Sequence, residues 1–430
     1  MKAIANSMPG TKTLARGSEE ALRTMVGAAH VRPAEASDAV AGVPPQIVVE
    51  PGNEQELAAV LQYANEAGLC VAPRGGGTKL SWGNPPARLD LIVSTARLSR
   101  IIEHAWADLT VTVEAGCTIQ CLQETLAQHG QRLALDVLWP ERATVGGALS
   151  ANDSGALRLR FGGLRDLIIG ITLALPDGTL ATSGGKVVKN VAGYDLPKLA
   201  TGALGTLGVI TRAIFRLHPL PQNTRTFTIS ATSAGEMQHF VLKVQDSQLV
   251  HSAFQVRFGT DTPPEADILF EGTQAGLAAQ ETHLKKLAES NRVAKTGPAV
   301  WKARDRLWSS ANTGAVAKIS LLPAGIAKTV EAVERITARQ KVHWSAVVQA
   351  TGLSSLRLDG DAEALHTSLR ELRASLERNG GSLVVLHQPA GAAPLEAWGN
   401  PGDALPLMSA VKKQFDPKNI LNRGRFVGEI

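Results

Sequence analysis

The sequence predicts an α+β protein with two domains, and three observations lead to this prediction. The chain has 430 residues, which is longer than a single hydrophobic core usually serves. Its hydrophobic content of 44% and its 41 glycines are typical of a globular protein with many ordered loops. Around Pro219 and Pro221 the pattern changes from strands joined by glycine-rich loops to alternating strand and helix units, which favour an antiparallel sheet with helices on one face.

This pattern divides the chain into four segments. Residues 1–45 are rich in Ala, Ser and Pro, show weak periodicity and are expected to form an N-terminal extension. The first domain covers 46–220, the second covers 221–405, and a C-terminal segment covers 406–430. That last segment contains a helical pattern followed by a Pro-Lys-Asn turn.

The first domain opens with a strand and a helix. Residues 47–49 are apolar and β-branched, Asn53 with Glu56 fits a helix N-cap, and Gly68 ends the helix. Further strands are expected at 69–72, 89–93, 109–114, 167–175 and 207–217, with a helix over 118–129. The second domain is expected to hold strands at 226–230, 252–258 and 267–271, helices up to 249 and over 274–290, and another strand and helix set over 317–388.

Charge and cysteine content exclude several classes of protein. The net charge of +5 is small, and no cluster of Lys, Arg and aromatic residues indicates a nucleic-acid partner. Three cysteines are too few for a disulfide framework and favour a reducing compartment, while Cys117 and Cys121, one helical turn apart, are read as packing residues, so no metal site is expected. No signal pattern or membrane-spanning run occurs. We expect a cytoplasmic protein that reaches the inner membrane, if at all, through a partner.

The loop Pro73-Arg-Gly-Gly-Gly-Thr-Lys-Leu80 follows an apolar run and is suited to binding an anion. Consecutive backbone N–H groups in such a loop can point into one concavity. The Walker A motif is not met, because Lys186 is followed by Val187, and the glycine spacing of the dinucleotide fingerprint is not met either. Four more glycine-rich loops follow in the same domain. Together they indicate a long ligand that contains a pyrophosphate, and FAD has that length.

Five glycine-containing motifs, in the order in which they occur, resemble the PCMH-type FAD-binding domain of the vanillyl-alcohol oxidase flavoproteins. The branch that the chain resembles is the D-lactate dehydrogenase and glycolate oxidase group. The tail Phe415-Asp-Pro-Lys-Asn-Ile-Leu-Asn-Arg-Gly-Arg-Phe426 resembles the C-terminal signature of the family. The resemblance implies that 46–220 forms two subdomains, that 221–405 is a cap domain, and that the tail packs back on the FAD domain. The motifs are Pro73–Leu80, Thr144-Val-Gly-Gly147, Phe161-Gly-Gly-Leu-Arg-Asp166, Gly185-Lys-Val-Val-Lys-Asn-Val-Ala-Gly-Tyr-Asp195 and Gly205-Thr-Leu-Gly-Val-Ile-Thr211.

The resemblance also implies roles for single residues. The first loop would hold the pyrophosphate, and the second would approach the flavin, with Pro140 shaping it. Ser154 would donate a hydrogen bond, and the last motif would give apolar and backbone contacts. Many members link the flavin covalently to a His in or beside the first loop, and none stands here, so FAD is expected to be non-covalent. The expected cofactor-binding residues are Arg74, Gly75, Gly76, Gly77, Thr78, Lys79, Pro140, Thr144, Gly146, Gly147, Ser154, Val209 and Ile210.

The catalytic residues stay unassigned. Oxidation of a 2-hydroxy acid needs a base for the hydroxyl proton and a cation for the carboxylate. The catalytic relatives carry His-x-Gly-Asp-Gly-Asn-x-His, but the corresponding stretch 347–356 keeps only Gly352. Lys186 and Lys189 fit either a role beside a reduced flavin or that of solvated loop lysines. The stripe of Trp301, Arg304 and Trp308 is read as core.

A PCMH-type domain without this motif resembles the FAD-binding accessory subunits of bacterial glycolate oxidases. The resemblance implies two partners, a catalytic FAD subunit and an iron–sulfur subunit, since three cysteines cannot hold clusters in this chain. A small 2-hydroxy acid would be oxidised by the complex. Two alternatives stay open: a stand-alone FAD-dependent dehydrogenase of a hydroxylated substrate, and a structural subunit whose flavin does not turn over.

Overall fold

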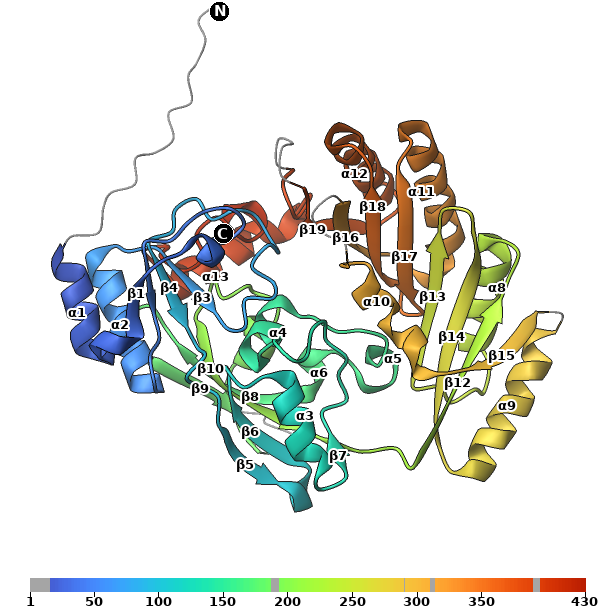
Figure 1. Cartoon of the computed structure of the whole chain (residues 1–430), viewed down its shortest axis with the longest axis horizontal. Helices are drawn as coiled ribbons and strands as arrows, with labels where there is room; N and C mark the ends of the chain where they lie inside the picture. The colour runs from blue at the N-terminus through green and yellow to red at the C-terminus, as the bar shows by residue number, and fades with distance from the viewer. Residues whose placement is uncertain (1–15, 187–192, 290, 310–313, 390–394) are drawn as a thin grey trace, which may run out of the picture.

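The computed structural model describes residues 16–186, 193–289, 291–309, 314–389 and 395–430. It shows the predicted α+β protein, with two sheets in the first domain and one large antiparallel sheet in the cap domain (Figure 1). Short 3-10 turns occur at η1 (Ala28–His30), η2 (Ala36–Asp38), η3 (Trp106–Asp108), η4 (Pro298–Lys302), η5 (Pro323–Gly325), η6 (Gly402–Ala404) and η7 (Val427–Glu429).

The first sheet has four strands in the order β1-β2-β4-β3. They are β1 (Val31–Pro33), β2 (Ile47–Val49), β3 (Val71–Arg74) and β4 (Leu91–Ser94), with β1 antiparallel to β2 and the other pairs parallel. Helix α2 (Glu54–Ala67) begins as predicted at Asn53, whose side chain accepts the N–H of Glu56 at 2.8 Å. It ends at Gly68, where φ is 66°.

The expected N-terminal extension differs from the structure. From residue 16 on, this segment forms α1 (Arg16–Val26) and β1, and both pack into the first subdomain, with Leu22 and Val31 in its core. Leu22, Met25 and Val26 lie on one face of α1 at a helical spacing that the prediction overlooked, whereas the three residues of β1 are too few to show a period.

The second sheet is antiparallel, in the order β5-β6-β10-β8-β9. Strands β6, β8 and β10 match the strands predicted at 109–114, 167–175 and 207–217, whereas β5 and β9 were not predicted. Both of these are edge strands with half-exposed residues, so they lack the apolar alternation of the buried ones. The bounds are β5 (Ile101–Ala105), β6 (Thr110–Glu114), β8 (Ile168–Ala174), β9 (Leu180–Gly184), β10 (Val209–Arg216), α3 (Ile119–Ala127), α4 (Val145–Ala151), α5 (Arg158–Phe161), α6 (Leu164–Leu167) and α7 (Leu196–Ala200), with a small pair β7 (Gln131–Arg132) and β11 (His218–Pro219).

The cap domain is built on an antiparallel sheet of eight strands in the order β15-β12-β14-β13-β17-β18-β16-β19. Helices α8, α9, α11 and α12 pack on one face, and the remaining face lies toward the FAD domain (Figure 1). The bounds are β12 (Asn223–Ser230), β13 (Ala253–Gly259), β14 (Thr262–Gly272), β15 (Arg292–Thr296), β16 (Gly314–Ser320), β17 (His343–Gln349), β18 (Leu353–Asp359), β19 (Ser382–His387), α8 (Ala234–Gln245), α9 (Gln274–Ala288), α10 (Ala303–Arg306), α11 (Ile326–Gln340) and α12 (Ala362–Glu377).

The C-terminal segment lies against the first sheet. After α13 (Leu405–Phe415), the chain runs beside β3: the N–H of Val71 donates to the carbonyl of Ile420 at 2.8 Å, and the N–H of Asn422 donates back to Val71 at 2.8 Å. A parallel partner therefore covers the free edge of β3, which is the strand that leads into the triple-glycine loop.

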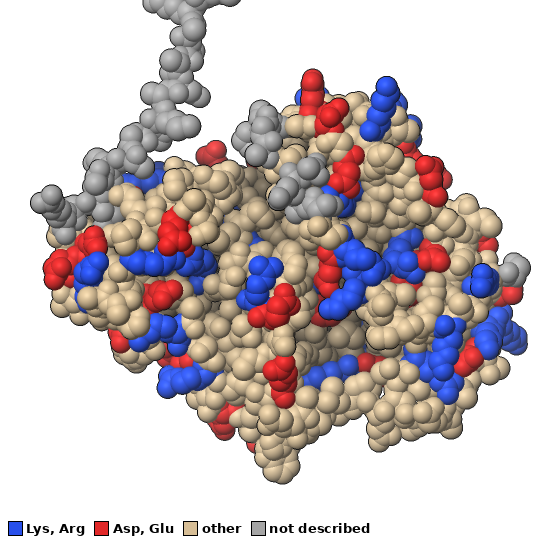
Figure 2. All heavy atoms as spheres, viewed as in Figure 1, with Lys and Arg blue, Asp and Glu red and all other residues tan. Residues whose placement is uncertain are grey.

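Ionic contacts tie the two domains together. Arg132 on β7 pairs with Glu271 on β14 at 2.7 Å, and both side chains are largely buried. On the face shown in Figure 2, Lys and Arg stand among Asp and Glu across both domains. None of the helices in the described part of the chain is both long and apolar enough to cross a membrane.

Candidate functional site: a nucleotide pocket and an adjoining polar cavity

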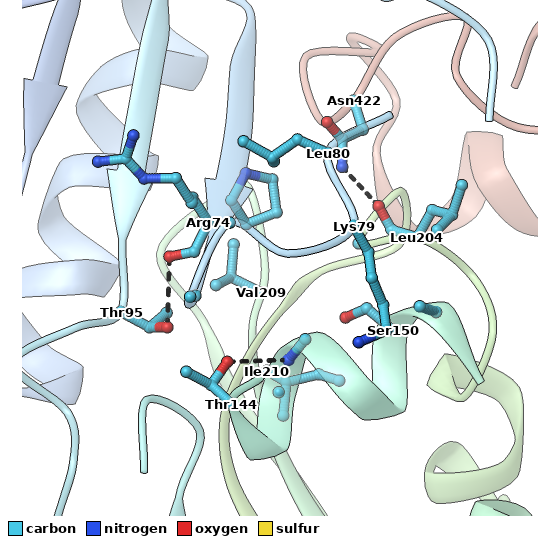
Figure 3. Close-up of a pocket in the computed structure, with 18 of the residues that line it drawn as sticks. Arg74, Lys79, Leu80, Thr95, Thr144, Ser150, Leu204, Val209, Ile210 and Asn422 are labelled. Atoms are coloured by element: carbon cyan, nitrogen blue, oxygen red, sulfur yellow. Dashed lines mark hydrogen bonds between the residues drawn. The ribbon is translucent and has the colours of Figure 1, made fainter. Parts of the chain in front are cut away.

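The triple-glycine loop forms one wall of a pocket between the two sheets of the first domain (Figure 3). It leaves β3 at Arg74, and the opposite wall is the start of α4, which Thr144 caps by accepting the N–H of Gly147 at 3.3 Å. The loop approaches this wall so closely that only glycine fits. A Cβ on Gly76 would lie 1.7 Å from the carbonyl oxygen of Arg142, and one on Gly75 would lie 2.0 Å from Oγ1 of Thr144.

The loop offers a row of free hydrogen-bond donors to the pocket. Among the residues that the structure describes, none accepts a hydrogen bond from the backbone N–H of Gly75, Gly76, Gly77 or Thr78. Gly77 takes φ of 70°, which turns the loop and which glycine adopts without strain. Successive free N–H groups on a concave loop form a binding site for an anion such as a phosphate. The pocket therefore fits the pyrophosphate of a dinucleotide.

A buried cation from the C-terminal segment lines the same pocket. Arg425 is 3% exposed and donates to the carbonyl oxygens of Leu80 and Trp82 at 2.8 and 2.7 Å. In the described part of the chain no carboxylate pairs with it, and burial lowers the pKa of its guanidinium to about 10. A buried cation that lacks a counter-ion favours an anionic ligand beside it.

Most of the expected cofactor-binding residues meet in this pocket, and two do not. Pro140 lies in the turn before α4, where its carbonyl accepts the N–H of Gln120 at 2.9 Å. Ser154 lines a second cavity instead. The expected residues that line the first pocket are Arg74, Gly75, Gly76, Gly77, Thr78, Lys79, Thr144, Gly146, Gly147, Val209 and Ile210.

The pocket also contains residues that sequence reasoning did not single out as binding residues. Leu80, Thr95, Ser150, Leu204, Gly205, Asn422 and Arg425 line it as well. Leu80, Gly205, Asn422 and Arg425 stand inside the quoted motifs, and these motifs are the sequence signal that marks them. Thr95 lies outside every quoted motif. It reaches the pocket because β4 pairs with β3, and the N–H of Thr95, directly after β4, donates to the carbonyl of Arg74 at 2.8 Å.

The two lysines expected near the flavin have different outcomes. Lys186 forms an ion pair with Glu103 on β5, and both side chains are about half exposed, as for a solvated loop lysine. Lys189 lies outside the described residues.

A second, smaller cavity lies between the FAD domain and the cap domain. Asn152, Asp153 and Ser154, directly after α4, form the wall on one side, and strands β16 to β18 with α10 form the wall on the other. Arg304 on α10 closes it by donating to Asp153 at 3.0 Å and to the carbonyl of Ser154 at 2.7 Å. Trp308 lines the cavity too. The reading as core holds for Trp308, which packs against two buried apolar clusters as well as lining the cavity. It does not hold for Arg304, because Asp153 of the neighbouring domain gives its guanidinium an ionic partner.

The second cavity gathers polar groups that lack partners. Lys318 on β16 reaches it, and no described residue pairs with its ammonium group. Desolvation lowers the pKa of Lys318, with Arg304 and Arg158 adding repulsion and Asp153 opposing them. Buried polar atoms of five further lining residues also have no partner within the described ranges of the chain: Trp82 Nε1, Asn152 Oδ1, Trp308 Nε1, Gln349 Oε1 and Ser354 Oγ.

This combination of groups suits a small anion. Two indole N–H groups, a hydroxyl and an ammonium group are donors, and a buried donor without an acceptor costs free energy until a ligand supplies one. The amide oxygens of Asn152 and Gln349 are acceptors, which a hydroxyl of the ligand would serve. The rings of Trp82 and Trp308 lie 6.2 Å apart and nearly parallel, which keeps the cavity narrow. A small carboxylate matches both the charge and the donors.

The comparisons with known proteins identify the first domain. Residues 45–184 match the family described as FAD binding domain. Across nearly the whole chain the fold matches p-cresol methylhydroxylase, with a TM-score of 0.76, 16% identity and coverage of 96% of this chain and 98% of that one. The first domain is a PCMH-type FAD-binding domain. Its free N–H row, its glycines and Arg425 are the features that fit FAD, which supplies a two-electron acceptor when bound.

Similar sequences are named as oxidases or dehydrogenases of 2-hydroxy acids. The chain is 27% identical to "Glycolate oxidase subunit GlcD" of Bacillus subtilis, over 89% of this chain and 88% of that protein. It is 27% identical to "D-lactate dehydrogenase" of Archaeoglobus fulgidus, over 89% of this chain and 92% of that one. A further similar fold is alkyldihydroxyacetonephosphate synthase, with a TM-score of 0.76, 16% identity and coverage of 97% and 87%. The FAD-binding domain and these relatives together make the chain an FAD-dependent oxidoreductase.

Replacing Arg425, which the C-terminal segment contributes to this pocket, with methionine tests its role toward FAD. We expect the dissociation constant of FAD to rise about tenfold or more, because a charge-assisted contact to the pyrophosphate is lost. Titration of the apoprotein with FAD, followed by flavin fluorescence, measures this. The matched control is Arg423→Met, since Arg423 is exposed two residues away. Equal affinities of the two variants would remove Arg425 from the site.

Proposed function

We propose that this chain is the FAD-binding subunit of a complex that oxidises a small 2-hydroxy acid such as glycolate, together with a catalytic FAD subunit and an iron–sulfur subunit. We place this complex in the cytoplasm, held at the inner membrane through its partners. The proposed substrate class rests on the similar proteins, whose names include glycolate oxidase and D-lactate dehydrogenase. The polar cavity supports it, since its donors suit the carboxylate of such an acid.

The position of residues 347–356 is the observation on which we base the assignment of catalysis to a partner subunit. This stretch forms the end of β17, a turn at Gly352 and the start of β18, and it supplies Gln349, Leu353, Ser354 and Ser355 to the polar cavity. In the catalytic relatives the corresponding motif supplies histidine and carboxylate groups. Here it supplies an amide, two hydroxyls and an apolar side chain. We infer that the base that takes the hydroxyl proton belongs to the catalytic partner.

One observation favours a second candidate, a stand-alone dehydrogenase. Burial lowers the pKa of Lys318, and a lysine with a lowered pKa becomes a base more readily. In this candidate the neutral amine of Lys318 would accept the hydroxyl proton of the substrate, and Arg304 would hold the carboxylate.

Reduction of the bound flavin by substrate separates the two candidates. The purified, FAD-loaded chain is mixed anaerobically with glycolate or D-lactate while flavin absorbance is recorded. The subunit proposal expects no bleaching by the chain alone and turnover after co-expression with a flavoprotein that carries the His-x-Gly-Asp-Gly-Asn-x-His motif and with a cysteine-rich iron–sulfur protein. Bleaching by the isolated chain would establish the stand-alone candidate. Complex activity that persists with an FAD-free form of this chain would indicate a structural role.

Replacing Lys318 with methionine tests carboxylate binding in the polar cavity. We expect the affinity for oxalate, an unreactive two-carbon carboxylate, to fall about tenfold or more in calorimetric titration, because the charge-assisted contact is lost. In the unsubstituted chain the affinity should be constant while Lys318 is protonated. It should then fall as pH rises through the Lys318 pKa, which burial places below 10.5.

The pH dependence has its own control. Lys341→Met removes an exposed lysine of the cap domain and should leave both the affinity and its pH profile unchanged. A Lys318→Met profile that still declines with pH like that of the unsubstituted chain would show that another group holds the anion.

A further inference from the structure

We propose that Asp153 couples the FAD pocket to the polar cavity, so that a small carboxylate bound in the cavity weakens the binding of FAD. The inference rests on the proposed function only in taking a small carboxylate as the ligand of the cavity. Asp153 is a positioning residue, since it acts through the cations on either side of it.

The geometry places Asp153 between the two sites. Its Oδ2 lies 3.2 Å from Nζ of Lys79, which lines the FAD pocket, and its Oδ1 lies 3.0 Å from Nη1 of Arg304, which lines the polar cavity. The N–H of Leu138 donates to Oδ2 at 2.9 Å and fixes the carboxylate in this orientation. One carboxylate thus holds one cation of each site. In Figure 3 the side chain of Lys79 extends from the glycine loop toward α4, the helix that Asp153 follows.

Burial makes these contacts strong. The side chains of Lys79 and Asp153 are 6% and 2% exposed, and that of Arg304 is 13% exposed. In such surroundings water screens charges weakly, so a change at one cation is felt by the other. Burial by itself would raise the pKa of Asp153, but Arg304 and Lys79 outweigh it and lower the pKa, so the carboxylate is ionised.

The cluster has more positive than negative groups. Lys79 touches the hydroxyl of Thr78 at 3.3 Å, and its ammonium group lies 5.4 Å from the ring centre of Trp139 and 5.6 Å from that of Trp82. Asp153 is the one carboxylate that pairs with either Lys79 or Arg304 among the described residues. Lys318 faces the cavity with no acidic partner there. Two cations therefore share one carboxylate, and a third cation lies nearby without an ion-pair partner among the described residues.

This sharing links the two ligands. An anion in the polar cavity competes with Asp153 for the donors of Arg304, and Asp153 then binds Lys79 more tightly. Lys79 becomes less available to the anionic cofactor in the FAD pocket, so the affinity for FAD falls. By thermodynamic linkage FAD must weaken the carboxylate by the same factor.

The test measures the FAD dissociation constant of the full-length apoprotein with and without saturating oxalate. We expect oxalate to raise it about fivefold or more in the unsubstituted chain. In Asp153→Asn the factor should fall below about two, because neither cation is then shared. Each ligand alone should still bind that variant, as calorimetry of oxalate without FAD will show. The exposed Asp246→Asn serves as the charge control and should keep the full factor.

A second variant decides the question if Asp153→Asn does not fold. Lys79→Gln removes the other end of the link and should lower the factor below about two as well, and the double variant should lower it no further. A factor of one in the unsubstituted chain, or a factor retained in both single variants, would overturn the proposal. Neither result depends on turnover or on partner subunits. The coupling can therefore fail while the proposed function holds, and the proposed function can fail while the coupling holds.

Discussion

Replacing Gly76 with alanine is expected to abolish FAD binding at micromolar cofactor and to leave a folded apoprotein. The new Cβ would lie 1.7 Å from the carbonyl oxygen of Arg142 and 2.8 Å from its carbonyl carbon, so backbone must move. The loop and the turn before α4 would separate, and the N–H row would lose its shape. Two lost N–H contacts to phosphate correspond to an FAD affinity lower by on the order of 100-fold. Overpacking should also cost about 1–3 kcal/mol of stability.

FAD titration and chemical unfolding measure these two effects. The control is Gly297→Ala, because a Cβ at Gly297 meets nothing within 4 Å and the residue takes an ordinary negative φ of −86°. We expect this control to bind FAD normally. If Gly76→Ala bound FAD like Gly297→Ala, the close approach of the loop to the α4 wall would have no part in cofactor binding.

Replacing Lys412 with methionine is expected to lower the free energy of unfolding by about 3–5 kcal/mol. Lys412 is buried and donates to Asp416 at 2.6 Å, to the carbonyl of Thr206 at 2.8 Å and to that of Leu421 at 3.0 Å. Its removal leaves the carboxylate of Asp416 buried without its cation. The strand-like segment beside β3 should loosen with it, and FAD affinity should fall, because Asn422 and Arg425 follow directly.

Lys413→Met is the matched control for this substitution. It removes the same charge from the same helix, but Lys413 is exposed. Denaturant unfolding of both variants should differ by several kcal/mol. A difference below about 0.5 kcal/mol would show that the Lys412–Asp416 pair does not hold the C-terminal segment.

The elements that the sequence predicted well are those whose local signals agree with their burial. Helix α2 has an N-cap at Asn53 and a left-handed stop at Gly68, and buried strands such as β2 and β4 carry continuous apolar runs. Edge strands β5 and β9 escaped prediction because their half-exposed residues have no apolar period. The short elements within residues 16–45, such as the three-residue strand β1, were also missed, because such elements become recognisable only by what they pack against.

The sequence alone predicted the glycine loop as the place of the cofactor, and the tertiary structure decided the rest. The run of three glycines is visible in the residues themselves, although the close approach that requires glycine at 75 and 76 is made to Thr144 and Arg142. The ion link from Lys79 through Asp153 to Arg304 joins positions 79, 153 and 304, and no local pattern relates them. Long-range contacts of this kind depend on how the domains meet. The polar cavity could therefore be recognised only in the tertiary structure, whereas the glycine loop could be recognised in the sequence.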